Sequence, residues 1–147
     1  MKSVFDGSVK DELLKRFEML QPNSARQWGK MMPAQMLAHC TETLRVPVGD
    51  LKVKRTFASL IGWMFKGMAT SEKPFSKNSP TADEFMIRDT RDFDAEKKRF
   101  AVAFEKLARG PSSITCLDHP FFGKMSATDW GHLMYKHLDH HLRQFGV

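Results

Sequence analysis

The stretch SATDWGHLMYKHLDHHLRQFGV, residues 126–147, decides the fold. Ser126 and Asp129 have the spacing of a capping box, with Asp in place of the usual Glu, so we expect a helix to begin here and to run nearly to residue 147. Apolar side chains then recur at steps of three or four residues, which predicts an amphipathic helix. They are Trp130, Leu133, Met134, Leu138, Leu142 and Phe145.

Two histidines fall on the apolar face of this predicted helix. Each residue advances about 100° around a helix, so His137 and His141 lie one turn apart on the same side. If the position of Trp130 around the helix axis is taken as zero, His137 lies at roughly −20° and His141 at roughly +20°. The other apolar side chains centre at roughly +45°. His140 falls at the edge of this face and His132 on the opposite side. We therefore expect His140 at the rim and His132 on the surface.

A buried pair of imidazoles needs partners for its nitrogen atoms, because each unsatisfied buried polar group costs about 1 to 3 kcal/mol. Carbonyls, carboxylates or waters are one set of partners for His137 and His141. The i, i+4 spacing on one face equally suits two nitrogen ligands of a single metal ion. The helix by itself leaves both interpretations open.

Two more amphipathic helices are predicted in the first third of the chain. SVKDELLKRFEML, residues 8–20, begins with Ser8 as a candidate cap and repeats its apolar side chains at helical steps: Val9, Leu13, Phe17 and Leu20. Pro33 suits the first turn of the next helix, which continues through AQMLAHCTETLRV and should stop by Pro47 and Gly49. The apolar stripe of that helix is marked by Met36, Cys40 and Leu44.

The middle of the chain adds one long helix and one short one. Residues 92–110 should form the long helix, which ends at Gly110 and Pro111 and places on one face Phe93, Phe100, Phe104 and Leu107. FASLIGWMFKGM, residues 57–68, predicts a shorter helix in which Gly62 and Gly67 weaken the helical tendency. KPFSKNSP, residues 73–80, should be an irregular surface connection, and no series of strands is expected.

These elements predict one all-α domain over residues 1–147, a four-helix bundle with a short extra helix and loops between its second and third helices. The 147 residues are 41% hydrophobic and 27% charged, which is typical of one soluble globular domain. No apolar run approaches the ~20 residues of a membrane span, and no secretory signal is seen. We expect a cytoplasmic protein that does not bind membranes.

The net charge of +6 does not by itself indicate a nucleic-acid partner. Basic residues alternate with acidic ones, as in KDELLKR and RDTRDFDAEKKR, which favours a solvated surface of mixed charge. We therefore expect no nucleic acid to bind. The aromatic-rich segment FASLIGWMF, residues 57–65, carries more apolar surface than one domain is expected to bury, which predicts a homodimer.

Several other polar residues are candidates for a site. His39 lies in the middle of the second predicted helix, roughly 100° from the centre of its apolar stripe, and is the natural candidate for a third ligand, although periodicity alone does not select it over His119. Gln35 precedes it by one turn and Glu42 follows by three residues, so each is a candidate to orient the imidazole or touch a substrate, although a plain surface position suits both. His119, in LDHPFFGK, is expected either at the mouth of a pocket or in a hydrogen bond that stabilises its loop. We also expect His140 at the edge of such a pocket.

Four segments together resemble an uncharacterised bacterial branch of the DinB/YfiT-like superfamily: WGKMMPAQMLAHC at 28–40, KPFSKNSPTADEF at 73–85, HPFFGKMSATDWG at 119–131 and MYKHLDHHLRQFGV at 134–147. The resemblance implies an up-down-down-up four-helix bundle. It also implies a divalent metal ion bound by one histidine of the second helix and an H-x-x-x-H pair of the last. These positions fall on His39, His137 and His141.

Three neutral imidazoles leave a metal ion its charge and an open coordination position, which is typical of catalytic sites. Nitrogen ligands favour zinc, nickel or iron over magnesium. Because the superfamily includes thiol-dependent transferases and isomerases, the resemblance implies a metal-dependent enzyme that activates a low-molecular-weight thiol, or water for hydrolysis, against a small-molecule substrate. The alternative is a non-catalytic helical protein that binds metal or dimerises.

Overall fold

The computed structural model describes residues 1–55 and 59–147, and this part of the chain is mainly helical. The long helices are α1 (Gly7–Met19), α2 (Pro33–Arg45), α5 (Phe93–Leu107) and α6 (Ala127–Gln144). Two short helices, α3 (Ser59–Gly62) and α4 (Lys66–Ala69), lie between α2 and α5, and single turns of 3-10 helix cover Trp63–Phe65, Asp83–Phe85 and Pro111–Ser113. Strands β1 (Asp118–His119) and β2 (Gly123–Lys124) pair antiparallel.

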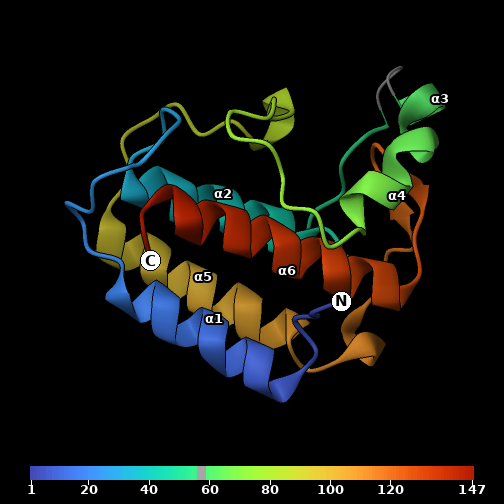
Figure 1. The fold of residues 1–147 in the computed structure, drawn as a ribbon, viewed down its shortest axis with the longest axis horizontal. Helices are drawn as coiled ribbons and strands as arrows, with labels where there is room; N and C mark the ends of the chain where they lie inside the picture. The colour runs from blue at the N-terminus through green and yellow to red at the C-terminus, as the bar shows by residue number, and fades with distance from the viewer. Residues whose placement is uncertain (56–58) are drawn as a thin grey trace.

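The four long helices lie side by side, and α1 and α6 run in the direction opposite to α2 and α5 (Figure 1). Helix α2 contacts both α5 and α6, and α6 also contacts α1. Helices α1 and α5 meet through Phe17 and Phe100, whose ring centroids are 4.0 Å apart. Each long helix contributes almost fully buried side chains to one apolar core, among them Leu13, Leu37, Phe104 and Leu138.

The beginnings of α5 and α6 follow from local sequence. In α6 the predicted capping box is present, because the Asp129 amide donates to the Ser126 hydroxyl at 3.1 Å and the Ser126 amide donates to the Asp129 carboxylate at 2.8 Å. Helix α5 begins after Asp92, whose carboxylate accepts a hydrogen bond from the Ala95 amide at 2.8 Å. These side chains satisfy backbone donors that have no partner within the helix.

The predicted cap of α1 is wrong. Ser8 lies inside the helix, and Asp6 occupies the capping position, although its carboxylate accepts from the Ser3 amide and not from the helix. Helix α2 begins at Pro33 as predicted, and the Gln35 side chain accepts from the Met32 amide at 2.9 Å. This contact gives Gln35 a structural role at the start of α2.

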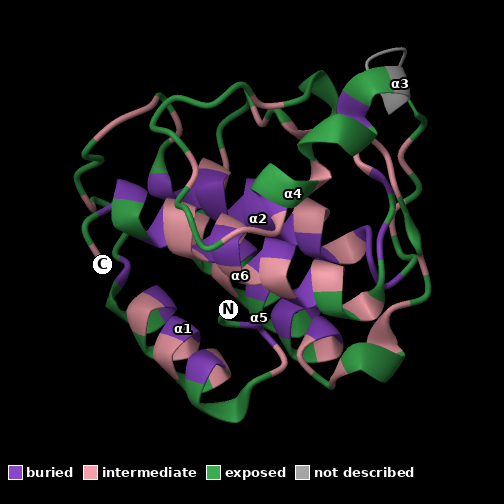
Figure 2. Ribbon diagram, turned by 45° about the vertical axis from the view of Figure 1, so that its right-hand side comes forward, coloured by how far each residue is buried: buried purple, intermediate pink, exposed green. Residues whose placement is uncertain are grey.

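The segment between α2 and α5 departs from the simple helix predicted for residues 57–68. Phe57 lies outside the described residues, and the part that follows is divided into α3, one 3-10 turn and α4. Figure 2 shows much exposed ribbon along α3 and α4. The exposed apolar side chains here are Ile61, Trp63, Met64, Phe65 and Met68, and the homodimer predicted from this segment stays a prediction.

A small hairpin precedes α6, where no strand was predicted. Asp118 pairs with Lys124 and His119 with Gly123. His119 Nδ1 accepts from the backbone amides of Phe121 at 3.0 Å and Phe122 at 3.1 Å, so the imidazole holds the turn between the strands. Two-residue strands are too short to show an alternating pattern, which is why the sequence did not predict them.

In the described residues, no helix combines the length and the apolar composition that crossing a membrane requires.

Gly131 allows the N-terminal segment to pack directly on α6. The Val4 amide donates to the Gly131 carbonyl at 3.2 Å, and Val4 is fully buried. A Cβ atom added at Gly131 would lie 2.7 Å from the Phe5 ring, which is closer than real contacts allow.

We expect Gly131→Ala to lower the free energy of unfolding by about 1 to 3 kcal/mol, because the added methyl group forces the N-terminal segment away from α6. Gly67→Ala is the matched control, since a Cβ atom on this helical glycine would meet no described atom within 4 Å beyond its own helix. That change should be neutral or stabilise by up to about 1 kcal/mol. Urea unfolding measures both, and equal effects would contradict the packing argument.

Candidate metal centre

Helices α2 and α6 bring His39, His137 and His141 together. One nitrogen atom from each ring can be chosen so that all three lie within 4.8 Å of one another. Nε2 of His39 and Nε2 of His137 are 2.9 Å apart. The ring centroid of His141 lies 4.7 Å from that of His39 and 4.6 Å from that of His137. The three predicted ligands therefore form a single cluster.

The other nitrogen atom of each ring faces an oxygen atom. His39 Nδ1 lies 2.9 Å from the Phe85 carbonyl, and His141 Nδ1 lies 3.0 Å from the Gln144 side-chain oxygen. Because these oxygen atoms can only accept, both Nδ1 atoms carry the proton and donate it. Both Nε2 atoms consequently keep a free lone pair.

His137 has the same orientation through a longer contact. Its Nδ1 lies 3.4 Å from the Thr43 hydroxyl, and that hydroxyl donates to the Cys40 carbonyl at 2.9 Å. The threonine oxygen is thus left to accept from His137 Nδ1. The Nε2 atoms of His39 and His137 then face each other, and one ring nitrogen of His141 lies within 4.8 Å of a nitrogen of each.

This arrangement fits a divalent metal ion. Lone pairs 2.9 Å apart repel each other unless a proton or a cation lies between them. Nitrogen atoms of neutral imidazoles are common ligands of transition metals, and a hydrogen bond from the second ring nitrogen is the usual way in which such ligands are oriented. The cluster can therefore hold one metal ion through three nitrogen atoms.

Burial keeps the three imidazoles neutral. His39 and His141 are only 3% and 6% exposed. Desolvation is the main cause that lowers the pKa of His141 to about 3, and it lowers the pKa of His39 and His137 as well. The neighbouring imidazoles lower the pKa of His137 further. At neutral pH all three rings are in the form that binds metal ions.

Two residues that sequence reasoning missed hold His141 in place. Gln144 accepts from His141 and donates its amide to the Trp28 carbonyl at 2.9 Å. Gly29 follows Trp28 with φ of 78°, and a side chain at Gly29 would collide with the Gln144 amide nitrogen. The spacing of His141 and Gln144, one turn apart, is the signal that could have indicated Gln144.

The polar contacts described for Gln35 and Glu42 do not reach the imidazoles. The Gln35 amide donates to the Asp89 carbonyl at 3.1 Å. Glu42 forms ion pairs with Arg45 at 2.8 Å and with Arg99 at 2.7 Å, so it ties α2 to α5. Their predicted contribution to the site stays a prediction.

His119 and His140 lie outside the cluster of three. His119 packs against Trp130 with ring centroids 5.0 Å apart and belongs to the hairpin before α6. The His140 ring lies beside that of His141, with centroids 5.2 Å apart. His140 also lines a small pocket beside the cluster.

We expect Gly29→Ala to weaken zinc binding about tenfold, because it displaces Gln144, which orients a metal ligand. The matched control is Gly110→Ala, since Gly110 also has a positive φ, 124°, but a Cβ atom there would meet no described atom within 4 Å. Competition with a chromophoric chelator measures the affinity. A loss of the same size in both variants would show that backbone strain, and not Gln144, causes it.

The low pKa values also predict how stability depends on pH. The pKa of His141 is lowered to about 3 and that of His119 to about 4, from 6.5, mainly because burial desolvates both rings. The unfolded chain therefore binds these protons at higher pH than the folded chain. The contribution of the neutral His119 and His141 imidazoles to the free energy of unfolding is therefore complete above about pH 6.5. It is lost as the pH falls.

For the metal-free protein we expect a smaller free energy of unfolding at about pH 5.5 than at about pH 7.5, a window above the range in which carboxylates titrate. Urea unfolding at both pH values measures the difference. The double variant His119→Gln, His141→Gln should show a smaller difference, and an undiminished one would contradict this assignment.

Comparison with known proteins places the chain in a family. Residues 6–146 match the family described as a protein of unknown function (DUF1569). No curated protein and no solved structure matches the chain significantly. Because the match covers almost the whole sequence, the chain belongs to the DUF1569 family.

Proposed function

We propose that this protein is a metal-dependent enzyme in which His39, His137 and His141 bind one divalent transition-metal ion, which is zinc, nickel or iron. The observation that carries the proposal is that three imidazoles each bring one ring nitrogen within 4.8 Å of the others, while the Nδ1 atom of each ring faces an oxygen atom. Neutral nitrogen ligands favour these metals over magnesium or calcium.

A site with three protein ligands has room for a further ligand, which distinguishes catalytic from closed structural metal sites. A bound ion supplies Lewis acidity, which lowers the pKa of a coordinated thiol or water. The protein's own residues orient the ligands: Phe85 acts on His39, Thr43 on His137 and Gln144 on His141. We propose a low-molecular-weight thiol as the activated group, with water as the competing one.

We also propose that the helices form the up-down-down-up bundle of the DinB/YfiT-like superfamily. The opposite directions of α1 and α6 relative to α2 and α5 support it (Figure 1). So does the origin of the three imidazoles, one from the second long helix and an H-x-x-x-H pair from the last.

Replacing the ligands tests the site. We expect His137→Ala and His141→Ala each to abolish stoichiometric binding of zinc, nickel and iron, because two remaining imidazoles hold these ions much more weakly. His132→Ala and His140→Ala should retain it. Metal content after dialysis measures the result, and circular dichroism verifies that each variant is folded. Loss of metal in His140→Ala with retention in His141→Ala would show that the wrong face of α6 was chosen.

The same variants test catalysis. Metal-loaded protein should accelerate the reaction of glutathione with chlorodinitrobenzene, in which a carbon–sulfur bond forms and chloride leaves, and His137→Ala should not. Hydrolysis of nitrophenyl acetate tests water as the activated group. A protein that binds metal but accelerates neither reaction with any of the three metals would support a non-catalytic metal-binding protein in place of an enzyme.

A further inference from the structure

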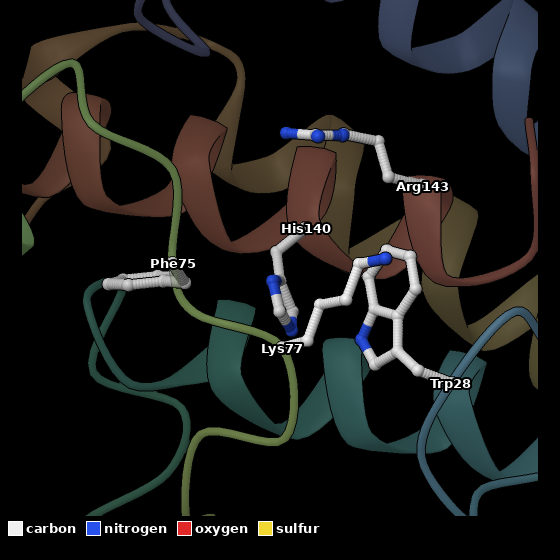
Figure 3. Close-up of a pocket in the computed structure, with 5 residues that line it drawn as sticks. All are labelled: Trp28, Phe75, Lys77, His140 and Arg143. Carbon is white, nitrogen blue, oxygen red and sulfur yellow. The ribbon is translucent and has the colours of Figure 1, made fainter.

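A small pocket lies beside the three histidines and is built from aromatic and basic side chains. It is lined by Trp28, Phe75, Lys77, His140 and Arg143 and has a volume of about 30 Å³ (Figure 3). His140 lies between two aromatic rings, 5.7 Å from Trp28 and 6.0 Å from Phe75 between centroids. Side chains from α6 and from two segments outside the long helices meet here.

The pocket presents hydrogen-bond donors and positive charge. The Lys77 ammonium lies 4.8 Å from the centroid of the Trp28 ring. Arg143 is 3.9 Å from Asp139, whose carboxylate is already bound at 2.8 Å by Arg16. The Arg143 guanidinium is therefore only weakly neutralised, and the lining, as far as the described residues form it, carries two cations and no carboxylate.

Trp28 contributes a donor that is not yet used. Its Nε1 atom is buried and has no hydrogen-bond partner in the described part of the chain. Figure 3 shows this nitrogen on the side of the ring that is turned toward His140 and Lys77. A buried N–H group without an acceptor costs free energy, so an acceptor supplied by a ligand would be favoured here.

We infer that this pocket binds the carboxylate group of a small-molecule substrate whose reacting group lies at the three histidines. The inference rests on the proposed function. The Trp28 indole N–H and the Lys77 ammonium supply donors, and Arg143 adds a second positive charge to the lining; hydrogen bonds assisted by charge are the strong ones. A volume of about 30 Å³ accommodates two or three water-sized groups, enough for the two oxygen atoms of a carboxylate.

The pocket is connected to the metal centre in two ways. The His140 ring is adjacent to His141, with centroids 5.2 Å apart. The Trp28 carbonyl accepts from Gln144, which orients His141. A carboxylate held beside Trp28 thus lies one imidazole ring away from the proposed ligands, which suits a short thiol acid or a short acid that carries an electrophile.

The indole N–H resonances in a proton–nitrogen correlation spectrum of the metal-free protein test the pocket directly. Trp28→Phe identifies the Trp28 resonance. Propionate should shift this resonance and leave those of Trp63 and Trp130 in place, and propionamide, which has the same shape without the charge, should not. No shift with propionate, or equal shifts with both compounds, would overturn the inference.

Charge variants locate the binding site. Lys77→Gln combined with Arg143→Gln should raise the dissociation constant of propionate about tenfold, in line with the loss of a charge-assisted hydrogen bond. Lys15→Gln combined with Arg109→Gln is the matched control, because both residues are exposed and lie outside the pocket lining. An equal loss in the control would assign the effect to net charge and would overturn the inference.

The zinc-loaded protein tests the connection to the metal centre. Mercaptoacetate should bind more tightly than mercaptoethanol, and the Lys77→Gln, Arg143→Gln variant should lose this preference. Equal binding of the two thiols by the unaltered protein would overturn the shared site. Propionate binding without any metal uptake would refute the proposed function alone, and metal uptake without propionate binding would refute the carboxylate pocket alone.

Discussion

The rest of the structure depends on one constraint, which is that three imidazoles share a buried space between α2 and α6. A buried ring nitrogen without a partner costs free energy, so each ring must be oriented by an acceptor on one side. The acceptors of His39, His137 and His141 are a backbone carbonyl, a hydroxyl and a side-chain amide. Because all three act on Nδ1, the Nε2 atoms are left available to a ligand, and the fold itself brings the three rings together.

Two of these orienting contacts come from segments outside the long helices. Phe85 belongs to the long connection between α4 and α5, and the loop before α2 fixes Gln144 through the Trp28 carbonyl. Phe75 belongs to the same connection between α4 and α5, and its ring packs against that of His140. The Lys136 Nζ atom also lies 4.4 Å from the centroid of the Phe75 ring. The loops are therefore part of the site and not only links between helices, since moving either one would release an imidazole.

Helical phase explains how much of this could be predicted. In α6 the apolar pattern is strong, so the placement of His137 and His141 on one face follows from the sequence. His39 lies about 100° from the centre of the stripe of α2, yet it is only 3% exposed, and its Nδ1 donates to Phe85. That burial depends on a residue 46 positions away, which no local pattern contains. The two-residue strands around His119 were missed for the related reason that they are too short for periodicity.

The three-histidine cluster and the pocket beside Trp28 both favour a negatively charged ligand. Three neutral imidazoles donate electron pairs but no negative charge, so a divalent ion bound by them would retain its full charge in a poorly hydrated environment. Such a charge favours an anionic ligand such as a thiolate. The pocket beside Trp28 adds two more cations on the side of His140, and Asp139 is engaged mainly with Arg16. A substrate that carries one negative charge at its reacting atom and another at a carboxylate would complement both, whereas a neutral substrate would leave the Trp28 N–H without an acceptor.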